Sequence, residues 1–362
     1  MFNLADYQSK NAGNTAREIA QQPAVWRALA DTLARRKDEI ATFMAGHSGL
    51  RTVFTGAGSS AFIGEAMQML LNRELGLRAE AVPTTDIVAS PDSVLFDTPT
   101  LLVSYSRSGE SPESVGALQY AAKKIKKLSN LVLVCKEDSS VARHAAGSAE
   151  TLALNMPPES CDLGFAMTSS VSCMALATWC AFGYKEFDQR LARVRALADT
   201  VEKHFDAVCG KARQLATMDF NRLVYLGNGA LRGLAREGAV KMLELTAGAV
   251  HAGWDTPTGF RHGPKSVINE RTMTVHFISP LVFTRQYDRD VLDEIRGQQK
   301  GNLVVDVAPD EKDEIGAYIM GLLFTQLFAM EKSLALGCNT DSPFAGTGDV
   351  NRVVKGVKIY EL

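Results

Sequence analysis

Short apolar runs recur along this chain at nearly the same spacing twice. The runs are rich in β-branched and aliphatic residues, and helix-like segments separate them. Their centres lie 50 and 29 residues apart in the first half, and 51 and 29 residues apart in the second. The central residues are Val53, Val103 and Val132, then Val224, Val275 and Val304. Strands that alternate with helices predict parallel sheets covered on both faces, and the repeated spacing predicts a tandem duplication.

Both copies open in the same way. A strand-like run leads into a glycine turn and then into a helix-like segment, in Val53–Gly58 (VFTGAG) and in Val224–Gly229 (VYLGNG). We therefore expect two α/β domains, each a three-layer αβα sandwich around a parallel sheet, with their boundary in the polar helical stretch near residue 205. The expected domains are 46–205 and 206–362, and 1–45 is expected to be a helical lead-in.

The charge balance excludes a global attraction to polyanions. The 39 lysine and arginine residues nearly match the 41 aspartate and glutamate residues, so no net field draws the chain to nucleic acid or to an anionic membrane. The densest basic run, Lys123–Lys127, precedes an apolar strand-like segment and is typical of the solvated face of a helix. We therefore expect any anionic ligand to be held locally.

Cysteine usage and the apolar stretches favour a cytoplasmic protein without a membrane span. The six cysteines have no paired metal-ligand spacing, and several lie in apolar segments, which indicates reduced thiols and no metal site. Residues Met1–Asp6 lack the basic region and apolar core of a signal peptide. The longest apolar stretch, near Met174–Gly183, is too short to cross a bilayer and predicts a buried helix.

A glycine turn in the first copy has the form of an anion-binding loop. Gly56–Ala61 (GAGSSA) would aim backbone N–H groups from a tight turn and a helix N-terminus at one point, where the helix dipole favours negative charge. The same residues also fit a variant of the dinucleotide fingerprint, with Glu80 as the acid that would bind the ribose. The turn alone does not decide between the two ligands.

The next strand end favours a phosphate. Hydroxyl groups follow a buried strand directly, at Ser104, Ser106, Ser108 and Ser111. Such a cluster at the carboxyl end of a strand suits a terminal phosphate, which offers several acceptor oxygens. The alternative is that these serines only cap the following helix. We favour ligand binding, because one serine is enough for a cap. The second copy has Ile278–Val282 (ISPLV) at this point, so only the first half is expected to hold phosphate.

Candidate catalytic groups lie in the second copy. Glu237, Lys241 and Glu244 follow the spacing i, i+4 and i+7, which places them on one face of a helix. From spacing alone, a surface salt bridge and a catalytic cluster are equally good interpretations. His262 lies among small and rigid residues in Pro257–Lys265 (PTGFRHGPK), and it is the best catalytic candidate of the six histidines because imidazole transfers protons near neutral pH.

At these residues the chain resembles the sugar isomerase (SIS) superfamily, from about residue 46 to near its end. The serine loop is similar to the phosphate signature of that family. The string 237–244 (EGAVKMLE), followed by His262-Gly-Pro, is similar to the isomerase half of glucosamine-6-phosphate synthase. Three further strings look more specifically like the galactosamine-6-phosphate deaminase/isomerases of amino-sugar catabolism: 164–170, 257–265 and 350–354. The resemblance implies two tandem SIS domains.

The resemblance also implies roles for individual residues. The phosphate would be bound at the glycine turn and the serine loop, by Ser59, Ser60, Ser106, Arg107, Ser108 and Ser111. Arg107 stands where the synthase loop usually has glutamine. Thr168 and Ser169 would line the sugar site. Glu244 would be the base that moves a proton between C1 and C2, and His262 would open the sugar ring from the other subunit. Further catalytic candidates are Lys241, Glu237 and Lys355, the last placed like the ring-opening lysine of the synthase.

The activity that the resemblance implies is a deaminating isomerisation. D-galactosamine 6-phosphate would be converted to D-tagatose 6-phosphate and ammonia, in a cytoplasmic homodimer or higher oligomer with shared sites. Proton transfer of this kind needs a placed carboxylate and an ordered open-chain sugar, and it requires neither a cofactor nor a metal. Two alternatives stay open: an aldose–ketose phosphate isomerase that releases no ammonia, and a sugar-phosphate sensor without catalysis.

Overall fold

The structure, a computed structural model, divides into two compact units that interleave along the chain. It describes residues 2–146, 150–298, 303–307, 312–347, 350–352, 354 and 356–362. The five-stranded unit comprises Gln21–Asp162, Met167–Asp199 and the described part of 348–362. The four-stranded unit comprises the described part of Met1–Ala20, with Leu163–Ala166 and the described part of Thr200–Thr347. Helix α11 (Phe187–Ala216) contributes to both units, because the division falls between Asp199 and Thr200.

The five-stranded sheet is wholly parallel, with the order β2-β1-β3-β4-β5. Its strands are β1 (Arg51–Thr55), β2 (Ala79–Ala81), β3 (Thr100–Ser106), β4 (Leu128–Val134) and β5 (Thr151–Asn155). The strands expected around Val53, Val103 and Val132 are confirmed as β1, β3 and β4. The short edge strands β2 and β5 were not expected, since too few of their side chains are buried to give an apolar run.

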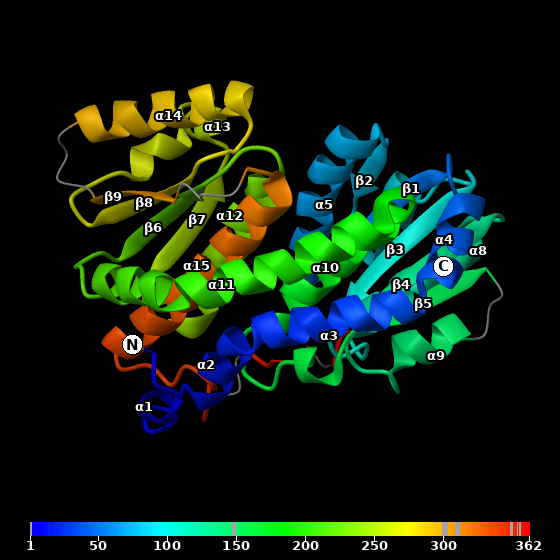
Figure 1. The fold of residues 1–362 in the computed structure, drawn as a ribbon, viewed down its shortest axis with the longest axis horizontal. Coiled ribbons are helices and arrows are strands. Elements are labelled where there is room, and N and C mark those ends of the chain that lie inside the picture. Colours follow the sequence, from blue (N-terminus) through cyan, green and yellow to red (C-terminus); the bar gives the residue numbers. More distant parts are fainter. Residues whose placement is uncertain are drawn as a thin grey trace. The chain divides into compact units, whose positions relative to one another are not determined.

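Helices cover both faces of this sheet (Figure 1). On one face lie α5 (Ser59–Leu75) and α10 (Ser169–Phe182), where the ring of Phe182 lies 5.4 Å from that of Phe54. On the other face, α6 (Thr84–Ala89), α8 (Pro112–Lys124) and α9 (Ser140–Ala146) close a cluster around Val53 and Leu102. Every residue of α10 is buried, which confirms the buried helix expected near 174–183.

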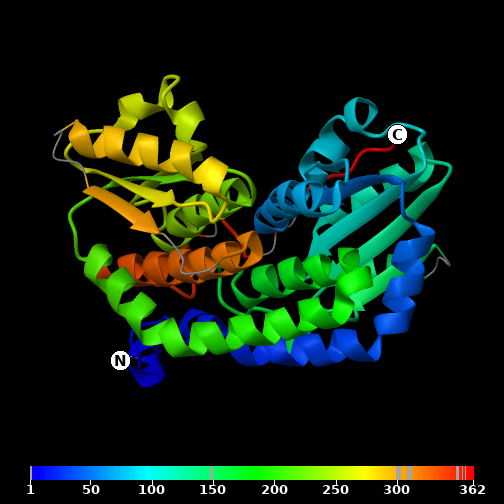
Figure 2. The same ribbon diagram turned by 45° about the horizontal axis from the view of Figure 1, so that its top comes forward.

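The remaining elements of this unit are short or peripheral. Helices α3 (Gln22–Arg35) and α4 (Lys37–Gly46) continue the cover over α10, and the Trp26 indole on α3 donates a 2.8 Å hydrogen bond to Ser172 on α10. The other short elements are α7 (Pro91–Val94), η1 (Pro158–Ser160) and η2 (Tyr184–Glu186). The C-terminal end of the chain returns to this unit, as Figure 2 shows.

The second sheet repeats the strand order of the first. It is parallel, with the order β7-β6-β8-β9, which matches β2-β1-β3-β4. Its strands are β6 (Arg222–Leu226), β7 (His251–Asp255), β8 (Thr272–Phe277) and β9 (Leu303–Val307). The two glycine turns also agree: Gly58 has φ 56° and ψ −129°, and Gly229 has φ 58° and ψ −131°. Both have the positive φ that glycine adopts without strain, so each turn needs its glycine.

Helices cover both faces of the second sheet as well. Helices α12 (Ala230–Leu245) and α15 (Glu314–Ala335) pack on one face, against Tyr225 and Phe277. Helices α13 (Pro257–Phe260) and α14 (Val282–Gly297) pack on the other, where Phe260 joins a cluster with Val224 and Val291. The 3-10 turn η3 (Pro264–Val267) follows α13. Among the described residues, no helix is long and apolar enough to cross a membrane.

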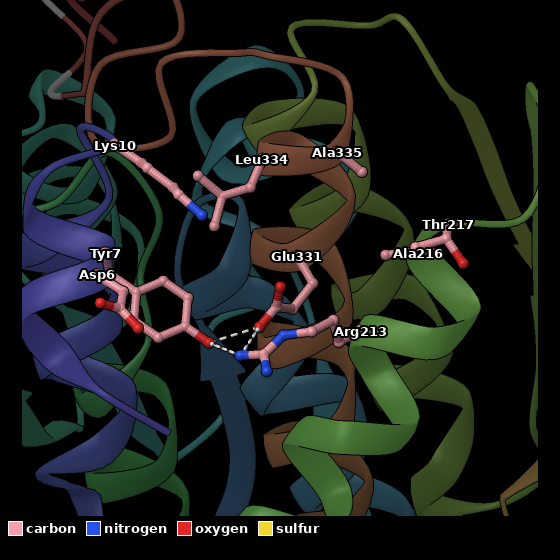
Figure 3. Close-up of a pocket in the computed structure, with 9 residues that line it drawn as sticks. All are labelled: Asp6, Tyr7, Lys10, Arg213, Ala216, Thr217, Glu331, Leu334 and Ala335. Carbon is pink, nitrogen blue, oxygen red and sulfur yellow. Dashed lines mark hydrogen bonds and ion pairs between the residues drawn. The ribbon is translucent and has the colours of Figure 1, made fainter. Parts of the chain in front are cut away.

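The N-terminal helices α1 (Leu4–Gln8) and α2 (Gly13–Ala20) belong to the four-stranded unit. The buried Tyr7 hydroxyl donates to Glu331 on α15 at 2.5 Å and accepts from Arg213 on α11 at 2.8 Å. Figure 3 shows these three side chains converging beside a cavity of about 420 Å³. Burial, aided by Glu331, raises the pKa of Tyr7 far above its ordinary value. The phenol therefore stays neutral and fastens α1 to two longer helices.

His276 on β8 gives the four-stranded unit a pH-dependent stability. The ring is fully buried, and burial, with a smaller effect of Arg296, lowers its pKa from 6.5 to about 4. The unfolded chain then takes up a proton near pH 6.5 while the folded chain does not, so the free energy of unfolding falls as the pH drops from 6.5 towards 4. We expect a loss of about 2 kcal/mol between pH 6.5 and pH 5 from this group, at roughly 1.4 kcal/mol per pH unit.

Urea unfolding of the wild type and of His276→Gln, at pH values from 7 to 5, measures this effect. The difference in unfolding free energy between the two proteins removes the contribution of all other titrating groups. That difference should shift in favour of the variant as the pH falls, and a difference that does not change with pH would contradict the expectation.

Candidate functional site

The glycine turn and the serine loop lie at the carboxyl ends of two adjacent strands of the five-stranded sheet. Strand β1 pairs in parallel with β3, with Thr55 opposite Ser104, so both strands end at the same edge. The glycine turn follows β1 and leads to Ser59 and Ser60, the first two residues of α5, both of which are buried. The serine loop (Ser104–Ser111) begins with the last residues of β3, which include Ser104 and Ser106, and continues beyond the strand. The two sequence motifs are therefore brought together by strand pairing.

Two serines of the loop use their oxygens to fold it. Ser106 Oγ accepts a hydrogen bond from the backbone N–H of Gly109 at 3.0 Å, and Ser108 Oγ accepts from that of Glu110 at 3.3 Å. Gly109 has a φ of 64°, so the loop turns at a residue that tolerates the left-handed region. In both bonds the serine oxygen is the acceptor, and each hydroxyl can still donate its hydrogen to an anion.

The capping alternative holds for one serine only. Ser111 is the N-cap of α8, and its Oγ accepts from the backbone N–H of Ser114 at 3.2 Å. Ser104, Ser106 and Ser108 precede the cap and do not serve it. The buried Ser104 Oγ has no hydrogen-bond partner in the described part of the chain, and an orphaned polar atom of this kind is uncommon in folded proteins. Capping therefore explains Ser111, the oxygens of Ser106 and Ser108 fold the loop, and Ser104 Oγ has no partner among the described residues.

Glu80, the acid of the dinucleotide alternative, is already engaged. Its carboxylate accepts two hydrogen bonds of 2.9 Å from the guanidinium of Arg51, and these bonds lower the pKa of Glu80. A carboxylate whose two oxygens both accept hydrogen bonds from one arginine is a poor partner for the hydroxyls of a ribose. The structure therefore favours the phosphate interpretation of the glycine turn.

Thr168 and Ser169 form the start of α10, and a buried aspartate orders them. The fully buried carboxylate of Asp162 accepts from the backbone N–H groups of Thr168, Ser169 and Ser170, at 2.8, 2.9 and 3.1 Å. It also accepts from the hydroxyls of Thr168 and Ser170, at 2.8 and 2.5 Å. No motif in the sequence predicts this role, because Asp162 stands outside all of them. A carboxylate that satisfies helix N-terminal N–H groups is favoured by charge and by hydrogen bonding.

Arg107 is turned towards the C-terminal segment. Its side chain is buried, and its Nη2 donates to the backbone carbonyl of Arg352 at 2.9 Å. A cavity of about 450 Å³ lies at the carboxyl ends of β4 and β5, lined in part by Cys135, Asn155 and Cys161. The backbone N–H of Cys135 donates to Ser106, so the cavity adjoins the serine loop.

The acid–lysine cluster on α12 is buried, which removes the surface salt bridge as an explanation. The side chains of Lys241 and Glu237 are 1% and 0% exposed, whereas that of Glu244 is 30% exposed. The Lys241 ammonium lies 3.5 Å from a Glu237 oxygen, and it also forms a close ion pair with Glu244. A buried ammonium between two carboxylates is costly to leave unpaired, so each group depends on the others. Only Glu244 keeps an exposed part that a substrate could reach.

His262 lies in an exposed turn between α13 and η3. The residues on either side of it hold the turn, because Arg261 and Lys265 both form ion pairs with Glu294 on α14. Phe260, two residues earlier, packs on the α13–α14 face of the second sheet, whereas α12 packs on the opposite face. Within one chain, the His262 turn therefore follows an element on one face of this sheet, and the helix that carries Glu244 lies on the other face.

Two further expectations concern a lysine and metal ions. Lys355 lies outside the described residues. In the part of the chain that the structure describes, no group of three or more His, Cys, Asp or Glu side chains is placed to hold a metal ion.

These features define the class of protein. The model of the SIS domain family matches residues 47–183, a segment that contains all five strands of the first sheet, the glycine turn and the serine loop. The chain is therefore an SIS-domain protein of the α/β class.

Relatives that match nearly the whole chain show to which group of the SIS family it belongs. The D-galactosamine-6-phosphate deaminase AgaS of Escherichia coli is 38% identical, over 96% of this chain and 95% of its own. An AgaS relative from Streptomyces coelicolor is 39% identical, over 97% of this chain and 96% of its own. The crystal structure of tagatose-6-phosphate ketose/aldose isomerase from Escherichia coli superposes with a TM-score of 0.87, at 33% identity and 96% coverage of both chains. The chain thus belongs to the SIS (sugar isomerase) family, in the group that contains the AgaS proteins.

Removal of two loop hydroxyls tests the phosphate assignment. Combining Ser106→Ala with Ser108→Ala should weaken the binding of every sugar phosphate by about tenfold or more, because a hydrogen bond to a charged group contributes roughly 1.5–3 kcal/mol. Calorimetric titration with a set of hexose 6-phosphates measures the change.

The matched control is Ser93→Ala, which removes an exposed hydroxyl from α7 of the same unit. It should bind like the wild type. Equal affinities of the wild type and the double variant, with both proteins folded by their thermal unfolding curves, would exclude these hydroxyls as phosphate ligands.

Proposed function

We propose that this chain is an amino-sugar-phosphate deaminase/isomerase that converts D-galactosamine 6-phosphate and water to D-tagatose 6-phosphate and ammonia. The observation that carries the proposal is the combination of a full-length similarity to AgaS deaminases with the hydroxyl-lined edge of the first sheet. The half-exposed Glu244, backed by the buried Lys241, supplies a candidate base.

The proposed reaction starts with the phosphate on Ser59, Ser60, Ser106, Ser108 and Ser111, with Arg107 in the same loop and with Thr168 and Ser169 beside the sugar. His262 assists ring opening, which exposes the aldehyde at C1. Glu244 then removes the proton from C2, which the neighbouring carbonyl acidifies, and returns a proton to C1. The C2 imine that results adds water and expels ammonia, leaving the ketose. One carboxylate can serve both transfers, because C1 and C2 are adjacent.

Lys241 and Glu237 have a supporting part in this proposal. The ammonium of Lys241 forms an ion pair with Glu244 and also lies near Glu237, so it can fix the orientation of the base. Its burial keeps water from competing for that ion pair. Lys355, placed by resemblance only, stays a further candidate for ring opening.

The proposal also covers the organisation of the chain. We propose two tandem SIS domains, 46–205 for the phosphosugar and 206–362 for the base, supported by the repeated strand order and the matching glycine turns. A cytoplasmic location is proposed from the cysteine usage, and all six cysteines, each in the described part of the chain, are free thiols. Whether the reaction is classed as a hydrolysis or an isomerisation depends on the fate of the nitrogen.

An ammonia-release assay tests the reaction directly. The wild type should release ammonia from galactosamine 6-phosphate, with equimolar ketose 6-phosphate, and Glu244→Gln should lower kcat by about 100-fold or more while phosphosugar binding persists, as general-base catalysis contributes roughly 10²–10⁴-fold. Glucosamine 6-phosphate and the two N-acetylated 6-phosphates complete the substrate set. Glu270→Gln, an exposed change in the same unit, should leave kcat unchanged.

The other outcomes identify the alternatives. Ketose formation from an aldose 6-phosphate without ammonia would indicate the non-deaminating isomerase, an activity that the name of the similar Escherichia coli protein, tagatose-6-phosphate ketose/aldose isomerase, favours. Binding of sugar phosphates without any turnover would indicate a sensor. Full activity of Glu244→Gln would remove this residue from the mechanism.

Mixed oligomers test whether His262 acts on a partner's site. Helix α12, which carries Glu244, and Phe260, two residues before His262, pack on opposite faces of one sheet, which supports a site that takes Glu244 and His262 from different subunits. If so, Glu244→Gln and His262→Ala subunits in one dimer should form one intact site. Random pairing of equal amounts should restore about one quarter of the wild-type activity.

Co-expression of the two variants with different affinity tags, followed by tandem purification, isolates the mixed species. Mixed oligomers of Glu244→Gln with Glu244→Ala are the control and should stay inactive. Failure of the Glu244→Gln and His262→Ala pair to regain activity, in a purified mixed dimer, would place both residues in the same subunit's site or remove one of them from catalysis.

A further inference from the structure

We propose that Arg352, in the C-terminal segment, is a positioning residue that ties the serine loop to the loop at the start of α10. The inference rests on the proposed function, since it concerns the two parts of the same substrate site. Arg352 is neither one of the hydroxyl residues nor one of the carboxylate residues of the proposed site. All of the contacts involved lie within the five-stranded unit.

The first link joins the serine loop to the C-terminal segment. Arg107 Nη2 donates to the backbone carbonyl of Arg352 at 2.9 Å, across 245 positions of sequence. Arg107 is buried and Arg352 is exposed, so this bond is partly shielded from solvent, and a charge-assisted bond in such a place is stronger than one at the surface. This bond holds Arg107, and with it the serine loop, against Arg352 of the C-terminal segment.

The second link joins the C-terminal segment to the α10 loop. Arg352 Nη1 donates to the backbone carbonyl of Asp162 at 2.7 Å. Asp162 in turn gathers the N–H groups of Thr168, Ser169 and Ser170 on its buried carboxylate. One residue therefore accepts from the serine loop with its backbone and donates to the aspartate that orders the sugar loop. The two parts of the site meet at Arg352.

Ile359 and Tyr360, near the C-terminal end of the chain, are held against α8. The Tyr120 hydroxyl on α8 donates to the backbone carbonyl of Tyr360, and Ile359 packs against the hydrophobic cluster beneath α8. Gly116 on α8 lies so close to Ile359 that a Cβ there would come within 3.0 Å of its side chain. The end of the chain is thus packed on the same helix that the serine loop leads into.

This arrangement has a specific consequence for the substrate. The phosphate and the sugar carbons are bound by two loops that have no strand pairing with each other, and catalysis requires a fixed distance between them. Arg352 supplies that constraint in the free protein, before the substrate binds. Its loss should therefore loosen both loops together and weaken binding more than the chemical step.

Hydrogen exchange followed by mass spectrometry tests the inference without any substrate. Arg352→Ala should raise amide exchange about tenfold in peptides that cover 167–170, where the bond to Asp162 is lost. Exchange should also rise in 104–111, because the carbonyl of residue 352 that Arg107 binds is then no longer held by that bond, and loss of a hydrogen bond lowers the free energy of local opening. Arg352→Lys, which keeps a donor, should restore much of the protection. Lys358→Ala removes the same charge from an exposed place in the same segment and should exchange like the wild type.

Kinetics then separates positioning from a merely structural role. With galactosamine 6-phosphate, Arg352→Ala should raise KM about tenfold with a much smaller change in kcat, and Arg352→Lys should recover most of the affinity. Faster exchange confined to the C-terminal segment, with both loops as protected as in the wild type, would overturn the inference, and so would looser loops with an unchanged KM. If the wild type itself turned over no amino-sugar phosphate, the proposed function would fail, and the exchange data alone would decide whether Arg352 couples the loops.

Discussion

Parallel pairing of β1 with β3 is the constraint on which the candidate site depends. Parallel neighbours cannot be joined by a tight turn, so the chain must cross back over a face of the sheet between them. The helices of those crossovers bury the apolar faces, and both strands end at one edge. That edge receives the glycine turn after Thr55 and the serine loop after Ser106, although about fifty residues separate them. The meeting of these two motifs, which form the proposed phosphate site, is thus a consequence of how parallel sheets are connected.

The second sheet uses the same topology for a different purpose. Its strand order and its glycine turn repeat those of the first sheet, but the strand end at Ile278–Val282 has no serine cluster. Its candidate catalytic acids and lysine lie on α12, where Lys241 is buried between two carboxylates. A buried charge of this kind persists only when its partners are in place, because the cost of desolvation must be offset by pairing. The second unit therefore holds a preformed ionic cluster, and in the proposed reaction Glu244 is its reactive end.

Separate anchors hold each of the groups that the proposed mechanism uses. Glu294 pairs with both residues that flank the His262 turn, Asp162 orders the start of α10, and Arg107 reaches the C-terminal segment. These supporting residues are charged and are bonded to backbone or to opposite charge. Their arrangement follows a general requirement of active sites, in which the reacting groups need fixed geometry before the substrate arrives. The C-terminal segment is one of these anchors, because Arg352 contacts both loops of the proposed substrate site.

The sequence by itself determined the central strands, the glycine turns and the serine loop, because each is written in a local pattern of apolar spacing, glycine or hydroxyl residues. It also placed Glu237, Lys241 and Glu244 on one helix face, since helical periodicity is local. Periodicity does not say what that face packs against, so only the tertiary structure decided that Lys241 is buried and that the cluster is no surface salt bridge. Likewise, Asp162 stands outside every motif, and the string 350–354 around Arg352 does not say what Arg352 contacts, because the bonds of these residues join positions up to 245 apart. Such contacts depend on the packing of the whole unit, which no local pattern records.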